Sequence, residues 1–326
     1  MELYNAGTEE LLLSDYALSD DMDEPSLFPL PSVSLAPGEY YLCKLIDSPF
    51  YLNGKNDELY LSRQGKILDF VSLRAIPPAA SYGREKQGEW CFLETPSPNR
   101  PNGDGFLQVS SATLLQGRDG VFAPGESVSV LLEAPGEIYY TIDCSDPNEN
   151  GQLYTTPLLL SKNTILRAVA REDGKYRSAD AVFSFFFDEC TLPVVSLISD
   201  EPEDIKPLKQ MSARMPEIRA FISFYEEDGS FTLPCGVRLS GNFSRRNPEK
   251  SFKVFFRSAY GADGLSYDVF GTGVADYHSL GLRKGADSHA KALLFSSLLT
   301  YVYLPILSRR FCHADNPAPD LRAALL

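Results

Sequence analysis

Histidine and closely spaced cysteine are scarce in this sequence, which argues against a zinc site. The chain has three histidines, which are not clustered, and its cysteines lie far apart with no CxxC pair. Zinc sites draw on closely spaced cysteine and histidine ligands. A disulfide scaffold is typical of shorter chains with denser cysteines, so we expect mostly free buried thiols and leave one disulfide pair open. The six cysteines are Cys43, Cys91, Cys144, Cys190, Cys235 and Cys312.

Positive charge is also short, with 30 Lys and Arg against 44 Asp and Glu and a formal net charge of −14. Such a field repels nucleic acid and anionic membrane surfaces. We therefore expect no nucleic-acid partner, and a phosphate-bearing ligand would need a local exception. A solvated surface that keeps the protein soluble explains the acidity better than an acidic binding face.

The sequence has neither the pattern of a signal peptide nor that of a transmembrane helix. Met1 is followed directly by Glu-Leu-Tyr-Asn, with neither a basic nor an apolar leader region, so we expect no signal peptide in this chain. Because the first residues already resemble a strand, we expect a preceding piece with its partner strand to be missing. The uncharged run Ala292–Leu307 is shorter than the roughly 20 residues of a transmembrane helix. It predicts a helix that is apolar on every face and buried in a complete domain.

The sequence does contain many short strand-like runs rich in Val, Ile, Tyr and Phe, separated by Gly, Pro, Asn or Asp, and they include Thr164–Arg171, Val194–Ser199 and Gly236–Ser240. This pattern is typical of β-sandwiches rather than βαβ units. Thr95–Gly105 has the composition of a linker, and Asp188–Pro193 forms a weaker break. With about 150 residues per domain as a guide, the sequence predicts three segments. These are residues 1–104, 105–188 and 189–326.

The first segment carries the motifs Glu2–Asn5, Leu13–Asp21, Ala36–Tyr41 and Ser81–Arg84. Together they resemble the lamin-tail domain, an immunoglobulin-like sandwich of bacterial exported proteins. The resemblance implies an extracellular or cell-surface location for the full-length protein. The acidic run Asp20, Asp21 and Asp23 has neither the spacing nor the glycine of an EF-hand, so a solvated turn is favoured over a calcium site.

The second segment contains Ala134–Pro147, Leu153–Tyr154 and Thr164–Ala170. It resembles the small sandwich module at the C-terminus of chitobiases and β-hexosaminidases. Cys144 stands where that family has glycine, so the turn must accept a side chain. The resemblance raises the alternative of a glycan-stacking platform, but neighbouring strand residues face opposite sides, so a scaffold role is favoured. The platform would consist of Tyr139, Tyr140 and Tyr154.

The third segment contains Gly236–Arg257 and Leu282–Gly285. These stretches resemble the opening half of the CotH-type spore-coat kinase domain. The resemblance implies an incomplete α+β kinase-like domain, with ATP and Mg²⁺ as cofactors and a protein hydroxyl as phosphate acceptor. The predicted fold class is therefore mainly β, with two immunoglobulin-like sandwiches followed by this incomplete domain.

The stretch Gly236–Arg257 is a local exception to the acidic composition. It contains six basic residues and one acidic residue, which give it a net charge of +5. Two strands joined by a loop at Ser244–Pro248 would bring these cations together, as triphosphate binding requires. A basic loop that pairs with acidic strands is the plainer alternative. We expect Lys253 and Arg257 only to solubilise the outer strand face. The predicted phosphate contacts are Arg245 and Lys250, with Arg238 and Arg283 in support.

Phosphoryl transfer also requires carboxylates that hold Mg²⁺. By resemblance, the catalytic and metal-binding aspartates of the family follow the stretch that ends at Gly285, after which this chain has 41 residues. Asp287 reads as a helix N-cap, and His289 has no partner nearby, so no catalytic or metal-binding residue is predicted. We expect a fragment that is inactive by itself and does not bind ATP and Mg²⁺ productively. A non-catalytic adhesion or cell-wall glycan-binding protein is the alternative.

Overall fold

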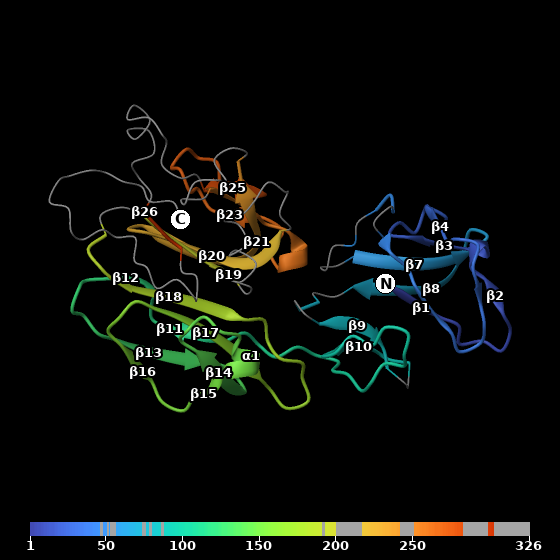
Figure 1. Ribbon diagram of the computed structural model, residues 1–326, viewed down its shortest axis with the longest axis horizontal. Helices are drawn as coiled ribbons and strands as arrows, with labels where there is room; N and C mark the ends of the chain where they lie inside the picture. The colour runs from blue at the N-terminus through green and yellow to red at the C-terminus, as the bar shows by residue number, and fades with distance from the viewer. Residues whose placement is uncertain are drawn as a thin grey trace. The chain divides into compact units, whose positions relative to one another are not determined.

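The computed structural model is mainly β, with 50% strand and 5% helix, which confirms the coarse fold class (Figure 1). The structure describes residues 1–45, 48–50, 52, 57–73, 76–77, 80–85, 88–190, 193–199, 217–241 and 251–282, and the backbone of 299–302. The chain forms two compact units. Unit 1 is residues 1–109 with 174–176, and unit 2 is residues 110–173 with those from 177 onward.

Unit 1 is built from short antiparallel strands around one apolar core. Its largest sheet has the order β4-β3-β7-β8, and three two-stranded sheets, β1-β6, β2-β5 and β10-β9, complete it. The core includes Leu18, Leu59 and Val71. The strands are β1 Glu2–Tyr4, β2 Leu11–Leu12, β3 Tyr16–Ser19, β4 Phe28–Pro29, β5 Ser34–Leu35, β6 Tyr40–Leu42, β7 Asp57–Arg63, β8 Lys66–Leu73, β9 Ser81–Arg84 and β10 Trp90–Leu93, with a 3-10 helix at Leu13–Asp15.

Unit 2 begins with a sandwich of a three-stranded and a five-stranded sheet. Their orders are β11-β13-β16 and β12-β18-β17-β14-β15. Val130 and Leu132 of the first sheet pack against Leu166 and Phe185 of the second. The elements are β11 Leu114–Gln116, β12 Gly120–Phe122, β13 Val128–Glu133, β14 Glu137–Thr141, α1 Pro147–Asn150, β15 Gln152–Leu153, β16 Leu158–Leu160, β17 Thr164–Arg171 and β18 Ala181–Phe187.

The rest of unit 2 is a six-stranded sheet with the order β25-β22-β21-β20-β19-β26. One face buries an apolar core that includes Val237, Leu239 and Val254 and is covered by Leu265. The strands are β19 Val194–Ser199, β20 Ile218–Glu226, β21 Gly229–Ser240, β22 Ser251–Phe255, β25 Ser279–Leu282 and β26 Leu299–Val302; the smaller elements are β23 Leu265–Ser266, β24 Asp276–Tyr277 and a 3-10 helix at Ser258–Tyr260.

The helix predicted across Ala292–Leu307 is wrong where the structure describes this run. Residues Leu299–Val302 form strand β26, which pairs in parallel with β19 and lies at the edge of the sheet. Thr, Tyr and Val favour strands, and β19 supplies the backbone partners on its side away from β20. The other residues of the run lie outside the described part of the chain. No helix within the described residues is long and apolar enough to cross a membrane.

The opposite face of the six-stranded sheet packs on the five-stranded sheet, so unit 2 has three stacked sheets (Figure 1). Ile165, Val182 and Phe186 on one sheet contact Val194 and Ile198 on the other in a shared apolar cluster. Strand β17 is consequently buried on both faces. The boundary predicted near residue 190 falls between β18 and β19, whose sheets stack within one compact unit.

Candidate functional site

Three basic side chains lie over the ring of Phe255, at the end of β22. The Cζ atoms of Arg238 and Arg257 are 4.7 Å and 4.8 Å from the ring centroid, and the Nζ atom of Lys253 is 5.1 Å from it. Each distance is within the range of a cation–π contact. We call Arg238, Lys253, Arg257 and Phe255 the basic cluster.

The register of the β21–β22 hairpin assembles the basic cluster. Arg238 lies opposite Lys253, and Gly236 lies opposite Phe255. Alternate residues of a strand share a face, so these four positions are on one side of the sheet. Val237 and other residues between them turn to the opposite side and enter the apolar core. The hydrophobic core therefore fixes which face carries the charges.

The positive charges of the basic cluster repel one another. Like charges directly opposite each other on antiparallel strands destabilise the pair, and Arg238 and Lys253 have this arrangement. Neither forms an ion pair with any described residue. The negative face of the Phe255 ring offsets part of the repulsion, and a bound anion would offset more.

Arg257 differs from the other two cations because it has an acidic partner. Its Nε lies 3.0 Å from Oε1 of Glu217, and its NH2 group donates to Oε2 at 3.2 Å. Tyr260 is hydrogen-bonded to the same carboxylate, and burial followed by the charge of Glu217 raises the pKa of Tyr260 to about 12. The phenol therefore stays protonated and serves as a donor.

Of the four predicted phosphate contacts, the structure describes Arg238 and places it in the basic cluster. Arg245, Lys250 and Arg283 lie outside the described residues, as do Asp287 and His289. Sequence reasoning gave no ligand role to Lys253 or Arg257, which the structure brings to the same ring. The signal that could have found them is the two-residue spacing of Lys253, Phe255 and Arg257 along the chain.

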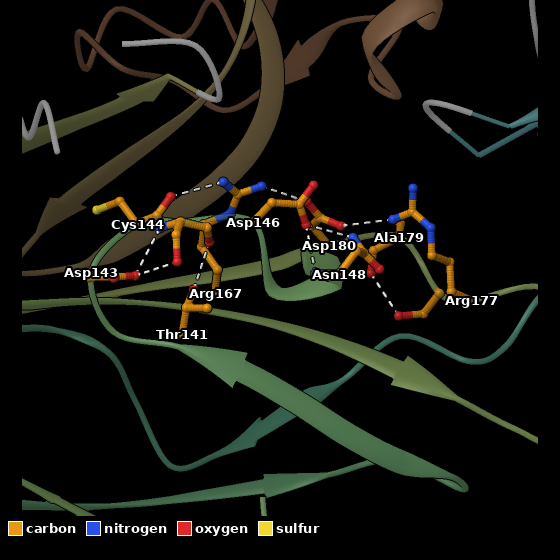
Figure 2. A network of polar contacts seen from close by, with 11 residues as sticks. Thr141, Asp143, Cys144, Asp146, Asn148, Arg167, Arg177, Ala179 and Asp180 are labelled. Atoms are coloured by element: carbon orange, nitrogen blue, oxygen red, sulfur yellow. Dashed lines mark hydrogen bonds and ion pairs between the residues drawn. The ribbon is translucent and has the colours of Figure 1, made fainter. Parts of the chain in front are cut away.

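Another arginine lies over a phenylalanine ring in the interior of unit 2. Arg167 on β17 has its Cζ 5.7 Å from the ring centroid of Phe221. Its NH2 lies 2.7 Å from Oδ2 of Asp180, and its NH1 donates to the Cys144 carbonyl at 3.1 Å. The exposed fractions of the two charged side chains are 2% and 4%. Figure 2 shows this network, which also includes Arg177 at 3.8 Å from Asp180.

The network holds the turn in which Cys144 replaces the glycine of the resembled family. Cys144 has φ +68°, in the left-handed region that favours glycine. Thr141 Oγ1 donates to the Ser145 carbonyl at 2.7 Å, and Ser145 Oγ donates to Asp143 at 2.6 Å. The Cys144 side chain is buried, and burial raises the pKa of its thiol to about 12. Its location indicates packing rather than thiol chemistry.

Asp119 and Tyr225 connect the two stacked sheets. The Tyr225 hydroxyl donates to Oδ2 of Asp119 at 2.6 Å, and the backbone N–H of Ser184 donates to the same oxygen at 3.2 Å. Ser184 also lies 3.3 Å from the Ser196 hydroxyl. Burial raises the pKa of Asp119 despite these bonds. The contact is polar but enclosed, so it fixes how the sheets stack.

The three tyrosines considered as a glycan platform have different surroundings. Tyr140 and Tyr154 pack against the sandwich core and meet edge to face, with ring centroids 6.1 Å apart. The Tyr154 hydroxyl also accepts a bond from the N–H of Leu132 at 3.1 Å. Tyr139 carries the guanidinium of Arg171 at 5.2 Å over its ring. The three rings therefore do not form one open stacking surface.

The acidic run of unit 1 forms local hydrogen bonds. Asp21 Oδ1 accepts from the N–H of Asp23 at 2.8 Å, and the N–H of Asp21 donates to the Ser19 hydroxyl at 2.9 Å. Throughout the described residues, no group of three or more His, Cys, Asp or Glu side chains is arranged to hold a metal ion.

Comparison with known proteins identifies one part of the chain. A family model with the description Fn3 associated matches residues 131–185, which run from β13 to β18. This match agrees with the two facing sheets observed there, so the region is a β-sandwich-type module. No curated protein matches the chain.

Proposed function

We propose that the third segment binds a phosphate-bearing ligand at the basic cluster. The observation that carries the proposal is the placement of Arg238 opposite Lys253, with Arg257 on the same ring, in a chain of net charge −14. Cations that face each other without acidic partners are suited to an anion. Arginine and lysine beside one another provide both directional hydrogen bonds and a point charge for phosphate oxygens.

A nucleoside triphosphate is the proposed ligand, because the third segment resembles the opening of the CotH-type kinase domain. Arg245, Lys250 and Arg283 would add further cations to the same ligand. Mg²⁺ accompanies ATP in that family, but the described residues offer no group of carboxylates that fits a metal ion. We therefore assign no phosphoryl-transfer step, and expect the chain to bind nucleotide weakly and to transfer nothing to a protein hydroxyl.

The wider proposal is that this chain belongs to an exported, multidomain bacterial surface protein. The lamin-tail and chitobiase-like resemblances of the first two segments support it, and the Fn3-associated match supports a sandwich in the second. In this proposal the sandwich is a scaffold, because its five-stranded sheet forms the base on which the six-stranded sheet is stacked. The competing proposal, a non-catalytic adhesion or glycan-binding protein, locates binding in residues 1–188 instead.

Isothermal titration with ATP, with and without Mg²⁺, tests the proposal. The paired substitution R238A/K253A should weaken binding at least tenfold, since two charge-assisted contacts are lost. The control K162A removes an exposed lysine elsewhere in unit 2 and should leave affinity unchanged. Equal affinity of all three proteins would refute the assignment. Glycan-array binding that is unaffected by R238A/K253A would favour the competing proposal.

A further inference from the structure

Glu217 lies beside the basic cluster and directly precedes β20. Its carboxylate engages Arg257 through both oxygens, at 3.0 Å and 3.2 Å, in a two-point ion pair. The side chain of Glu217 is 16% exposed, whereas that of Arg257 is 54% exposed. The carboxylate is thus more buried than the guanidinium with which it pairs.

Gly236 makes this position of the carboxylate possible. A Cβ atom at residue 236 would collide with both the ring of Tyr260 and Oε1 of Glu217. Gly236 lies opposite Phe255 in the hairpin, on the face that carries Arg238 and Lys253. The missing side chain is therefore what allows an acid and a phenol to approach the basic face closely.

The charged groups in and next to the basic cluster come from β20, β21 and β22 and from the residues that flank these strands. Strand β20 supplies Arg219, whose Cζ is 5.2 Å from the ring centroid of Phe221, and the residue before it supplies Glu217. The β21–β22 hairpin supplies Arg238 and Lys253, and Arg257 follows β22. An arriving anion meets these cations and also meets the carboxylate of Glu217.

We propose that Glu217 is an internal competitor that occupies Arg257 and thereby lowers the anion affinity of the basic cluster. The inference rests on the proposed function, since it concerns the same site. The ion pair and the hydrogen bond to Oε2 hold the guanidinium of Arg257 at the carboxylate, so Arg238 and Lys253 make the direct contacts with phosphate. Glu217 and Arg257 together contribute little net charge, and removal of the carboxylate should release the third cation.

The test is a double-mutant cycle in which the affinity for inorganic tripolyphosphate is measured at fixed low ionic strength. Glutamine keeps the shape of the glutamate side chain, so E217Q should bind about fivefold more tightly than the unmodified chain, as expected for one partly solvated ion pair. R257Q should bind more weakly, because Glu217 is left unpaired and repels the anion. The double variant E217Q/R257Q should return to the unmodified affinity, and K162Q should show no change.

The outcomes separate the two proposals. If the unmodified chain binds, R238A/K253A weakens binding and E217Q has no effect, the competitor role is refuted and the anion site stands. If E217Q/R257Q binds as weakly as R257Q, Arg257 contacts the ligand directly and the competitor role is also refuted. If neither the unmodified chain nor E217Q binds, both proposals fail. Should E217Q unfold, Y260F provides a second test, because loss of its bond to Glu217 should loosen the pair and raise affinity to a smaller extent.

Discussion

Arg167 and Arg238 of unit 2 both lie over phenylalanine rings, and their surroundings are opposite. Arg167 lies between two sheets, over Phe221, and the carboxylate of Asp180 pairs with it at 2.7 Å. Arg238 lies on the partly exposed face of a hairpin, over Phe255, opposite another cation and without an ion pair in the described part of the chain. The same kind of ring contact thus occurs both in a neutralised pair and in a cluster of like charges.

The difference follows from the cost of removing charge from water. Burying an arginine is costly unless an opposite charge and further hydrogen bonds compensate it, and Arg167 has the carboxylate of Asp180 and the carbonyl of Cys144. A cation that solvent still reaches can remain unpaired at small cost, so Arg238 and Lys253 can be kept for a ligand. The comparison therefore separates a structural arginine from a candidate binding arginine, although their ring contacts are alike.

The largest expected effect is loss of the buried pair. Replacement of Arg167 by alanine should destabilise unit 2 by about 3–5 kcal/mol, because Asp180 is left charged and buried. R238A should change stability by less than about 1 kcal/mol, or should stabilise slightly, because it removes a repulsion. Hydrogen exchange of β17 peptides in urea measures both, and reports on unit 2 alone. Similar losses for the two variants would contradict the distinction.

The next effect tests the close approach on the basic face. G236A should destabilise by about 1–3 kcal/mol, because the added methyl group displaces Tyr260 and Glu217. Its matched control is G281A, which lies opposite Lys253 on the neighbouring strand and has nothing within 4 Å of the added atom. G281A should stay within about 0.5 kcal/mol of the unmodified chain in urea unfolding. A larger loss for G281A than for G236A would be inconsistent with the observed packing.

A smaller effect concerns the turn beside Arg167. C144G and C144A both remove the buried thiol, but alanine keeps a Cβ atom in the left-handed conformation at φ +68°. C144G should therefore be more stable than C144A by about 1 kcal/mol. Urea unfolding of the two variants measures the difference directly. If C144A is the more stable protein, the turn does not carry the strain that its backbone angle implies.

The smallest effect is a pH dependence at the contact between the stacked sheets. Burial raises the pKa of Asp119 above its ordinary value of 3.8, so the folded chain binds a proton that the unfolded chain has already released. The contribution of Asp119 to the free energy of unfolding therefore falls as pH rises from near 3.8 through the raised pKa, and is constant above it. D119N should flatten this part of the pH profile, as measured by urea unfolding at a series of pH values. An unchanged slope would show that other groups cause it.

Strands were the part of the fold that the sequence predicted well. Thr164–Arg171 and Val194–Ser199 match β17 and β19 residue for residue, because β-branched and aromatic residues between turn signals give a strong pattern. Strand β21 was predicted only from Gly236 to Ser240, whereas in the structure it begins at Gly229 and pairs Pro234 with Phe221. Proline is uncommon inside a sheet, and the pairing with β20 carries the strand across it.

The stacking of the two large sheets could not be read from the sequence. Burial of β17 on both faces should give an uninterrupted apolar run, but Arg167 interrupts it, and Asp180, which permits the arginine to be buried, is 13 residues away. The candidate site was predicted in part for a similar reason. The cations of Gly236–Arg257 were recognised by their density, but the placement of Arg238 beside Lys253 and Phe255 depends on the register of the hairpin.

Lysine footprinting can detect anion binding at the basic cluster. The intact chain would be acylated briefly with and without tripolyphosphate, and the modified lysines quantified by mass spectrometry. The anion should protect Lys253, and with it Lys250, while Lys162 is modified equally in both samples. Equal modification of Lys253 in the presence and absence of a saturating anion would contradict the assignment of this face as a binding site.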